Sequence, residues 1–171
     1  MATRAVTAPA PLRAGHEADA FASGRHDALD NWLRERALTS EGLSARTYVI
    51  CDAADPQRIV GYYAITTAME QRANLPSAKL RRAMPEQVPL LLIARLAVDR
   101  AWQGMGLGAD LLHDALRRCL AASEIAGARG VIVHAIDEAA AAFYEHHGFL
   151  RSLLGDLTLI LSIETLRAAI D

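Results

Sequence analysis

The chain has 171 residues, of which 52% are hydrophobic and 22% are charged, and its formal net charge is −2. This length and composition are typical of one globular domain and argue against a disordered or fibrous protein. No run of 18 apolar residues occurs, so the sequence predicts no membrane-spanning segment.

The first fifteen residues contain two prolines and show no hydrophobic periodicity. They predict a flexible N-terminus over residues 1–15, followed by a single domain over residues 16–171. The same segment lacks the continuous apolar core of a secretory signal. The two cysteines, Cys51 and Cys119, form neither a metal-ligand spacing nor a disulfide framework. We therefore expect a cytoplasmic protein whose cysteines are reduced and buried.

The first half of the chain predicts one helix followed by strands. Apolar residues recur with a helical period over residues 26–38, where Asp27 is available as the N-cap. Residues 46–52 and 58–66 are typical of two strands joined by a turn. Residues 71–89 are polar and basic and contain three prolines, so they predict a loop with at most a short helical turn.

The second half of the chain predicts strands and helices in alternation. Residues 90–99 predict a buried strand, and an amphipathic helix is expected over residues 106–122. A strand over residues 130–136, a helix over residues 137–147 that ends at Gly148, and a strand over residues 157–163 complete the chain. This order predicts a mixed α/β fold around one sheet.

Three glycines, Gly104, Gly106 and Gly108, lie between the buried strand and the helix that follows it. Backbone N–H groups in the first turn of a helix have no partner within the helix, and they form an anion site at the positive end of its dipole. The phosphate loop of NTPases requires Gly-Lys-Ser/Thr, which does not follow here, so that pattern matches poorly. The Rossmann pattern also matches poorly, because these glycines do not lie in the first βαβ unit of the chain. A glycine-rich turn without a ligand remains the alternative.

Basic residues are concentrated in one part of this weakly acidic chain. Residues 71–100 contain six basic and two acidic residues, a local charge of +4. Such a band is either an ordinary solvated surface or the docking face for an anionic macromolecule.

The segment "QGMGLG" resembles the pyrophosphate signature of the GCN5-related N-acetyltransferases (GNAT), with Gln103, Gly106 and Gly108 in the pattern Q/R-x-x-G-x-G/A. With "HDALDNWLRERA", "VGYYAIT" and "FYEHHGF", the likeness extends over about residues 20–165 to the GNAT toxins of type II toxin–antitoxin modules, of the TacT and AtaT kind. This resemblance implies a GNAT fold: a mixed central sheet with splayed parallel strands, flanked by helices.

The resemblance also implies a site for acetyl-CoA and no metal. Tyr144 would be the catalytic residue that meets the departing sulfur, as a hydrogen-bond donor rather than a full acid, because a phenol is less acidic than a thiol. Asp137 stands where many relatives have asparagine near the cofactor arm, although it could simply cap the next helix. The remaining residues would contact the cofactor through the backbone of the strand and the bend: Leu96, Ala97, Val98, Gln103, Gly104, Met105, Gly106, Leu107 and Gly108.

The toxins that this sequence resembles acetylate aminoacyl-tRNA and so block translation. An α-amine with a pKa of about 7.8 loses its proton at neutral pH more easily than a lysine, which suits a site without an evident strong base. His134 could be a base, although a histidine in a buried strand is more often a hydrogen-bonded core residue. The tRNA would bind the basic band through Arg72, Lys79, Arg81, Arg82 and Arg95, with Arg34 and Arg36 as lesser candidates. Arg95 and Arg100 are near the cofactor strand and could meet either a CoA phosphate or the acceptor end of the tRNA.

The family also implies partners: a ribbon-helix-helix antitoxin, contact with operator DNA only through that antitoxin, and a homodimer. Two other functions stay open from the residues alone. One is acetylation of a small amine or a protein N-terminus, which the modest net charge would suit. The other is a non-catalytic role as the DNA-bound partner of an antitoxin.

Overall fold

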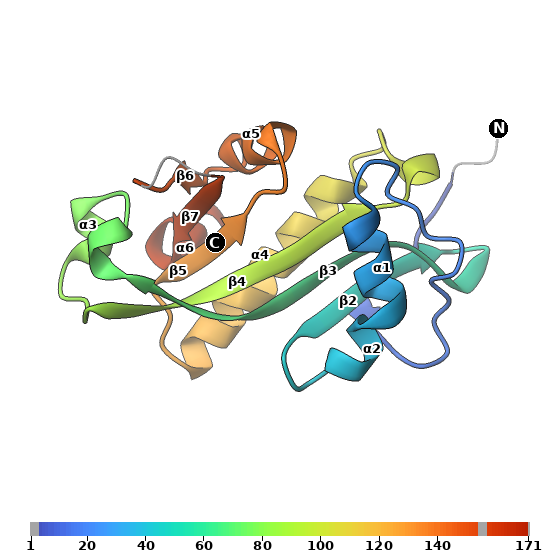
Figure 1. Cartoon of the computed structure of the whole chain (residues 1–171), viewed down its shortest axis with the longest axis horizontal. Coiled ribbons are helices and arrows are strands. Elements are labelled where there is room, and N and C mark those ends of the chain that lie inside the picture. The colour runs from blue at the N-terminus through green and yellow to red at the C-terminus, as the bar shows by residue number, and fades with distance from the viewer. Residues whose placement is uncertain (1–3, 154–156, 171) are drawn as a thin grey trace. The chain divides into compact units, whose positions relative to one another are not determined.

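The computed structural model describes residues 4–153 and 157–170, in which seven strands form one mixed sheet (Figure 1). The strand order is β1-β2-β3-β4-β5-β7-β6. The pairs β1–β2, β2–β3, β5–β7 and β6–β7 are antiparallel, whereas β4 and β5 are parallel. The strands are β1 (Ala10–Pro11), β2 (Arg46–Asp52), β3 (Asp55–Gln71), β4 (Gln87–Val98), β5 (Gly130–His134), β6 (Leu150–Arg151) and β7 (Thr158–Ser162).

Helices alternate with these strands along the chain, which confirms the predicted α/β class. They are α1 (Asp27–Glu35), α2 (Ala37–Ser40), α3 (Ala78–Arg81), α4 (Leu107–Ile125), α5 (Glu138–His146) and α6 (Ile163–Ile170), with 3-10 turns η1 (Arg72–Asn74) and η2 (Arg100–Trp102). None of the helices in the described part of the chain combines the length and apolar character needed to cross a bilayer.

Contacts within the chain divide it into two compact units. The first consists of the described residues up to Ile65 together with Arg95–Ala115, and the second consists of Thr66–Ala94 and the described residues from Leu116 onward. Each unit has its own cluster of buried apolar side chains.

The core of the first unit is built around Tyr62 on β3. Its ring contacts Phe21 edge-on, with centroids 5.6 Å apart, and stacks on Trp32 of α1 at 6.1 Å. The buried hydroxyl donates a hydrogen bond of 2.7 Å to the carbonyl of Leu29, so the only polar atom of this side chain is satisfied. The helix begins one residue earlier than predicted: His26 is the N-cap, and Asp27 is the first helical residue.

The N-terminal segment pairs with β2 over part of its described length, and the flexibility expected for residues 1–15 stays a prediction. Ala10 and Pro11 pair with β2, and the N–H of Leu12 donates to the carbonyl of Thr47 at 2.9 Å. Leu12 is itself buried in the core of the first unit. One buried side chain, a two-residue strand and the hydrogen bond from the N–H of Thr7 to the carbonyl of Cys51 connect the segment to β2.

The second unit buries the connection between β3 and β4 against the far end of the sheet. Leu75 and Leu80 from this connection pack with Val88 and Leu90 of β4, and with Ile132 of β5. The connection was predicted to be a loop with a short helical turn, and it contains η1 and α3. Its two buried leucines show that it is a packed segment of the protein.

The helix α6 is missing from the sequence-based expectation. It follows β7 without an intervening glycine or proline, so the apolar residues of the strand and the helix merge in the sequence. The Oγ atom of Ser162 accepts a hydrogen bond from the N–H of Thr165 at 3.1 Å. It thereby pairs one of the first N–H groups of α6, which have no partner within the helix. This local cap separates the two elements.

Candidate cofactor and acceptor site

The glycine bend between η2 and α4 is open on its outer side. Gly104 and Gly106 have φ angles of +81° and +82°, in the left-handed region that favours glycine. No atom lies within 4 Å of the position that a Cβ would occupy at either residue. These glycines therefore allow a backbone turn that exposes its N–H groups at the start of the 19-residue helix α4.

The base of this bend is fixed by hydrogen bonds within the first unit. The side-chain amide of Gln103 donates to the carbonyls of Ser23, at 2.8 Å, and Val98, at 2.9 Å. The buried carboxylate of Asp99 accepts from the N–H groups of Ala22 and Ala101. Because its amide is engaged with the protein, Gln103 holds the bend in place and can reach a ligand only through its backbone.

The residues flanking the bend lie at the end of β4, in the turn and at the start of α4. Leu96, Ala97 and Val98 end the strand β4 directly before η2, and the last two are buried. Met105 is 45% exposed at the turn, and Leu107 is buried in the first turn of α4. Gly108 lies within this helix.

Tyr144 lies on α5 in the second unit and is 7% exposed. Its ring makes edge contacts with Phe143 and Phe149, at centroid distances of 5.3 and 5.4 Å. Burial raises the pKa of its phenol to about 12. Among the described residues the hydroxyl has no hydrogen-bond partner, so a neutral donor is available at this position.

Asp137 and His134 lie near the start of α5 and have structural partners. The carboxylate of Asp137 caps the helix by accepting a hydrogen bond from the N–H of Ala140 at 2.8 Å. His134 was expected in the core, but it is exposed at the end of β5, and its Nδ1 lies 2.9 Å from Oγ1 of Thr158.

The basic residues of the band differ in what they contact. Arg72 donates to the carbonyl of Met84 at 2.7 Å, and Arg81 donates to the carbonyl of Leu75 at 2.6 Å. In contrast, Lys79 and Arg82 are exposed, and within the described part of the chain neither side chain forms a hydrogen bond or an ion pair. The charge of Lys79 also interacts with the carboxyl of Glu164. Lys79 and Arg82 are exposed cations that an external anion can approach.

The basic candidates of the first unit are also partly engaged. The guanidinium of Arg95 lies over the ring of Trp32, 4.4 Å from its centroid. Arg34 donates to the carbonyl of Phe21 at 2.6 Å. Arg36 and Arg100 are exposed.

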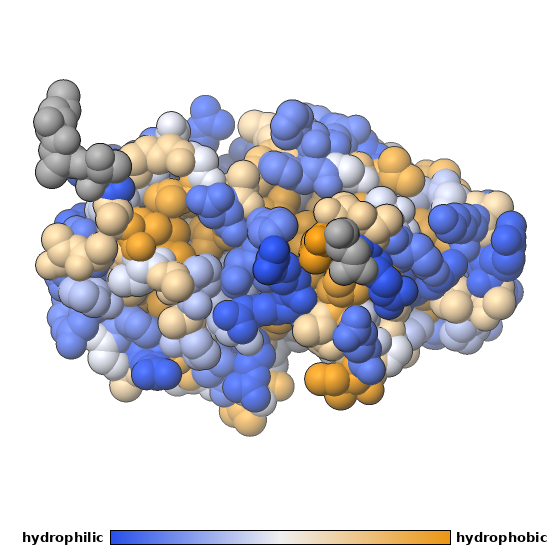
Figure 2. Space-filling view, turned by 180° about the vertical axis from the view of Figure 1, so that it is seen from behind, coloured by the Kyte–Doolittle hydropathy of each residue, from blue (hydrophilic) through white to orange (hydrophobic). Residues whose placement is uncertain are grey.

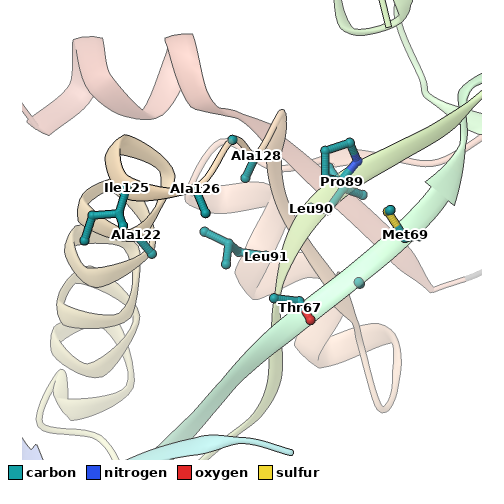
Figure 3. A pocket seen from close by; sticks show the side chains of 11 residues that line it. Thr67, Met69, Pro89, Leu90, Leu91, Ala122, Ile125, Ala126 and Ala128 are labelled. Atoms are coloured by element: carbon teal, nitrogen blue, oxygen red, sulfur yellow. The ribbon is translucent and has the colours of Figure 1, made fainter. Parts of the chain in front are cut away.

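An apolar cavity of about 570 Å³ lies in the second unit between β3, β4 and the carboxyl end of α4 (Figure 3). Alanine, leucine and isoleucine side chains line most of it, including Leu91, Ala126 and the 90% exposed Ile125. Such a surface offers no charged donors to a phosphate. On the face seen in Figure 2, apolar side chains reach the surface in separate patches among hydrophilic ones.

The described residues contain no group of three histidine, cysteine, aspartate or glutamate side chains that could hold a metal ion. Separately, the glycine bend at the start of α4 has the backbone chemistry that suits a phosphate-bearing cofactor.

Replacing Gly106 with valine should weaken acetyl-CoA binding at least tenfold. The substitution strains a backbone with positive φ and places a branched side chain in the open space above the bend. Calorimetric titration with acetyl-CoA measures the effect. Gly15→Ala is the matched control, since its Cβ also meets no atom within 4 Å but its φ is not positive. Unchanged affinity in Gly106→Val would show that the ligand binds elsewhere.

Comparison with known proteins agrees with this geometry. Residues 44–151 match the family model described as an acetyltransferase (GNAT) domain. The chain is 39% identical to a tRNA-acetylating toxin of Mycobacterium tuberculosis, over 96% of both chains. Among solved structures, AtaT complexed with acetyl-methionyl-tRNAfMet aligns with a TM-score of 0.88 and 26% identity, covering 98% of this chain and 100% of that one.

A further structural match contains two ligands. It is a tyrosine-to-phenylalanine mutant of the toxin AtaT, bound to the C-terminus of the antitoxin AtaR and to acetyl-CoA. The alignment has a TM-score of 0.81 and 25% identity, and it covers 96% of this chain and 98% of that one.

Proposed function

Because the chain belongs to the GNAT acetyltransferase family, we propose that it is a toxin that transfers the acetyl group of acetyl-CoA to the α-amine of aminoacyl-tRNA and so blocks translation. The observation that carries this proposal is the 39% identity to a tRNA-acetylating toxin over nearly the whole of both chains. An acetylated α-amine cannot attack the peptidyl ester, so peptide-bond formation stops.

The glycine bend would hold the pyrophosphate of acetyl-CoA. Its exposed N–H groups between Gly104 and Gly108 donate hydrogen bonds to charged oxygens, each contributing roughly 1.5–3 kcal/mol. The backbone at the end of β4, over residues 96–98, would bind the pantetheine arm. Asp137 then acts as the cap of α5, the helix that carries Tyr144.

Tyr144 would stabilise the leaving sulfur. The free amine attacks the thioester carbon, the C–S bond breaks, and the proton lost by the amine ends on the thiolate. With a pKa of about 12 against about 8.5 for a thiol, transfer of the phenolic proton to sulfur is uphill by about 5 kcal/mol. Tyr144 therefore keeps its proton and donates a hydrogen bond to the sulfur as negative charge develops.

The exposed cations of the β3–β4 connection would bind the RNA. Lys79 and Arg82 are the best placed, because Arg72 and Arg81 are engaged with backbone carbonyls, and Arg95 lies over Trp32. As in AtaT, for which a complex with the antitoxin AtaR is known, an antitoxin would neutralise the toxin. We infer from the family that this antitoxin is a ribbon-helix-helix protein that carries the contact with operator DNA, and that the toxin is a homodimer.

Incubation with labelled acetyl-CoA and total charged tRNA tests the proposal directly. Label should appear on the aminoacyl group and vanish when the tRNA is deacylated beforehand. Free amino acids, polyamines and peptides serve as competing acceptors. Label on one of these, with none on tRNA, would assign the protein to the small-amine or N-terminal acetyltransferases.

The pH dependence of acetylation should show an ascending limb only. The rate should rise as the acceptor α-amine loses its proton, near pH 8, and then level off. Because the raised pKa keeps Tyr144 protonated up to about pH 12, the phenol should cause no descending limb below that value. We would measure kcat/KM with an amide-linked aminoacyl-tRNA, which resists hydrolysis at alkaline pH. A fall centred near pH 10 would mean that a phenol of ordinary acidity controls the reaction.

A further inference from the structure

The side chain of Arg129, outside the proposed cofactor site, joins two helices of the second unit. Its Nε donates to the carbonyl of Leu80 at 3.2 Å, and its Nη2 donates to the carbonyl of Lys79 at 2.6 Å. Its Nη1 forms an ion pair with Glu164 on α6. With 16% of its surface exposed, this side chain is mostly enclosed by the groups it binds.

These bonds complete the hydrogen bonding of α3. In this four-residue helix, the carbonyls of Ser77 and Ala78 accept from the N–H groups of Arg81 and Arg82, at 3.2 and 3.0 Å. The next two carbonyls, at the carboxyl end, are the ones bound by Arg129. The guanidinium therefore supplies the donors that further helical turns would otherwise provide.

The position of Arg129 is itself fixed by the sheet. Its backbone N–H donates to the carbonyl of Pro89 on β4 at 2.8 Å, and its carbonyl accepts from the N–H of Ile163 at 3.1 Å. The adjacent Gly130 begins β5, where a Cβ would lie 2.5 Å from the carbonyl oxygen of Leu161. Arg129 thus connects α3 to the sheet, and a helix of this length would not be stable without such contacts.

The helix held in this way carries one exposed cation and is followed directly by another. Lys79 lies within α3, and Arg82 is its C-cap. The charge of Arg129 is balanced by Glu164, so its own attraction for an external phosphate is small.

We propose that Arg129 is a positioning residue for the aminoacyl-tRNA: by holding the carboxyl end of α3, it fixes where Lys79 and Arg82 present their charges to RNA phosphates. The inference rests on the proposed acetylation of tRNA. Its physical basis is pre-organisation, because a connection that is already ordered loses little conformational freedom when the RNA binds.

A double-mutant cycle tests this role. Arg129→Gln should raise the KM for aminoacyl-tRNA about tenfold, with kcat and the KM for acetyl-CoA unchanged. Arg82→Gln, which shares no charged partner with Arg129 among the described residues, should raise the same KM several-fold in the wild-type protein and by a much smaller factor in the Arg129→Gln background. Arg167→Gln is the control, since it removes the same charge from an exposed position on α6 without contacting α3.

Equal effects of Arg82→Gln in the two backgrounds would overturn the positioning role, and so would a parallel loss of acetyl-CoA binding. If Arg129→Gln fails to fold, Glu164→Gln replaces it in the cycle, because it weakens the ion pair that holds the guanidinium. The same two results would overturn the role in that background. A wild-type protein that acetylates no charged tRNA would instead contradict the proposed function. The two failures are therefore distinguishable.

Discussion

Replacing Tyr144 with phenylalanine is expected to lower kcat for acetyl transfer by a factor of about 10²–10³ and to leave acetyl-CoA affinity within about twofold. The substitution removes one oxygen and keeps the ring that packs between Phe143 and Phe149. Because the hydroxyl has no hydrogen-bond partner among the described residues, its removal leaves no described polar group unpaired. The loss should therefore fall on the transition state and leave the folded state stable.

Steady-state kinetics with charged tRNA, together with a thermal melt, measure both effects. Tyr48→Phe is the matched control, because Tyr48 stacks on Tyr63 at 5.2 Å in the first unit and has no proposed role in the reaction. If Tyr144→Phe retained wild-type kcat, the phenol would have no part in the chemistry. If growth arrest persisted in cells without acetylation, toxicity would have another origin.

Much of the fold could be predicted from the sequence because its periodic elements are long. The strand β2 was predicted with its observed bounds, since a run of β-branched and aromatic residues over 47–50 is followed closely by turn-forming residues. The helix α4 was found from its apolar stripe, and Gly148, with a φ of +96°, ends α5 as expected. The elements that were missed, β1, β6 and α6, are short or follow another element directly.

Some features of the candidate site could likewise be predicted from the sequence, and others could not. Gly104 and Gly106 have positive φ angles, which favour glycine, so the turn itself is visible in the sequence. That the turn binds a cofactor stays a prediction. The grouping of the arginines could not be predicted. Arg81 and Arg82 are neighbours in sequence, yet one donates to a carbonyl and the other is free.

The contacts of Arg129 are the clearest example of a feature that could not be predicted from the sequence. It donates to two backbone carbonyls that lie about fifty residues away in the sequence. Because every residue has a backbone carbonyl, the sequence does not indicate which of them accepts such a hydrogen bond. Nothing in the segment around it distinguishes this arginine from a solvated one. Only the packing of α3 against the end of the sheet reveals the contact.

Reversing two exposed charges of the connection, with Lys79→Glu and Arg82→Glu together, should lower kcat/KM for aminoacyl-tRNA about a hundredfold and leave acetyl-CoA binding unchanged. The sequence alone also offered the neighbouring pair Arg81 and Arg82 among its candidates. However, glutamate at Arg81 would also break the hydrogen bond to Leu75, and a loss of activity would then mix binding with folding. Neither side chain of the pair chosen here forms a hydrogen bond within the described part of the chain. Because Lys79 also interacts with the charge of Glu164, a thermal melt checks that the double variant keeps its fold.

The salt dependence of RNA binding adds a second measurement to this prediction. If each side chain neutralises one phosphate, the slope of log K against log salt should become shallower by about 1.4–1.8 for the double variant. Arg25→Glu with Arg167→Glu is the control, because it makes the same change in net charge at exposed positions outside the connection. Equal losses in both double variants would mean that the RNA responds to the overall charge of the protein. A selective loss in the first would place the RNA on the connection that Arg129 holds.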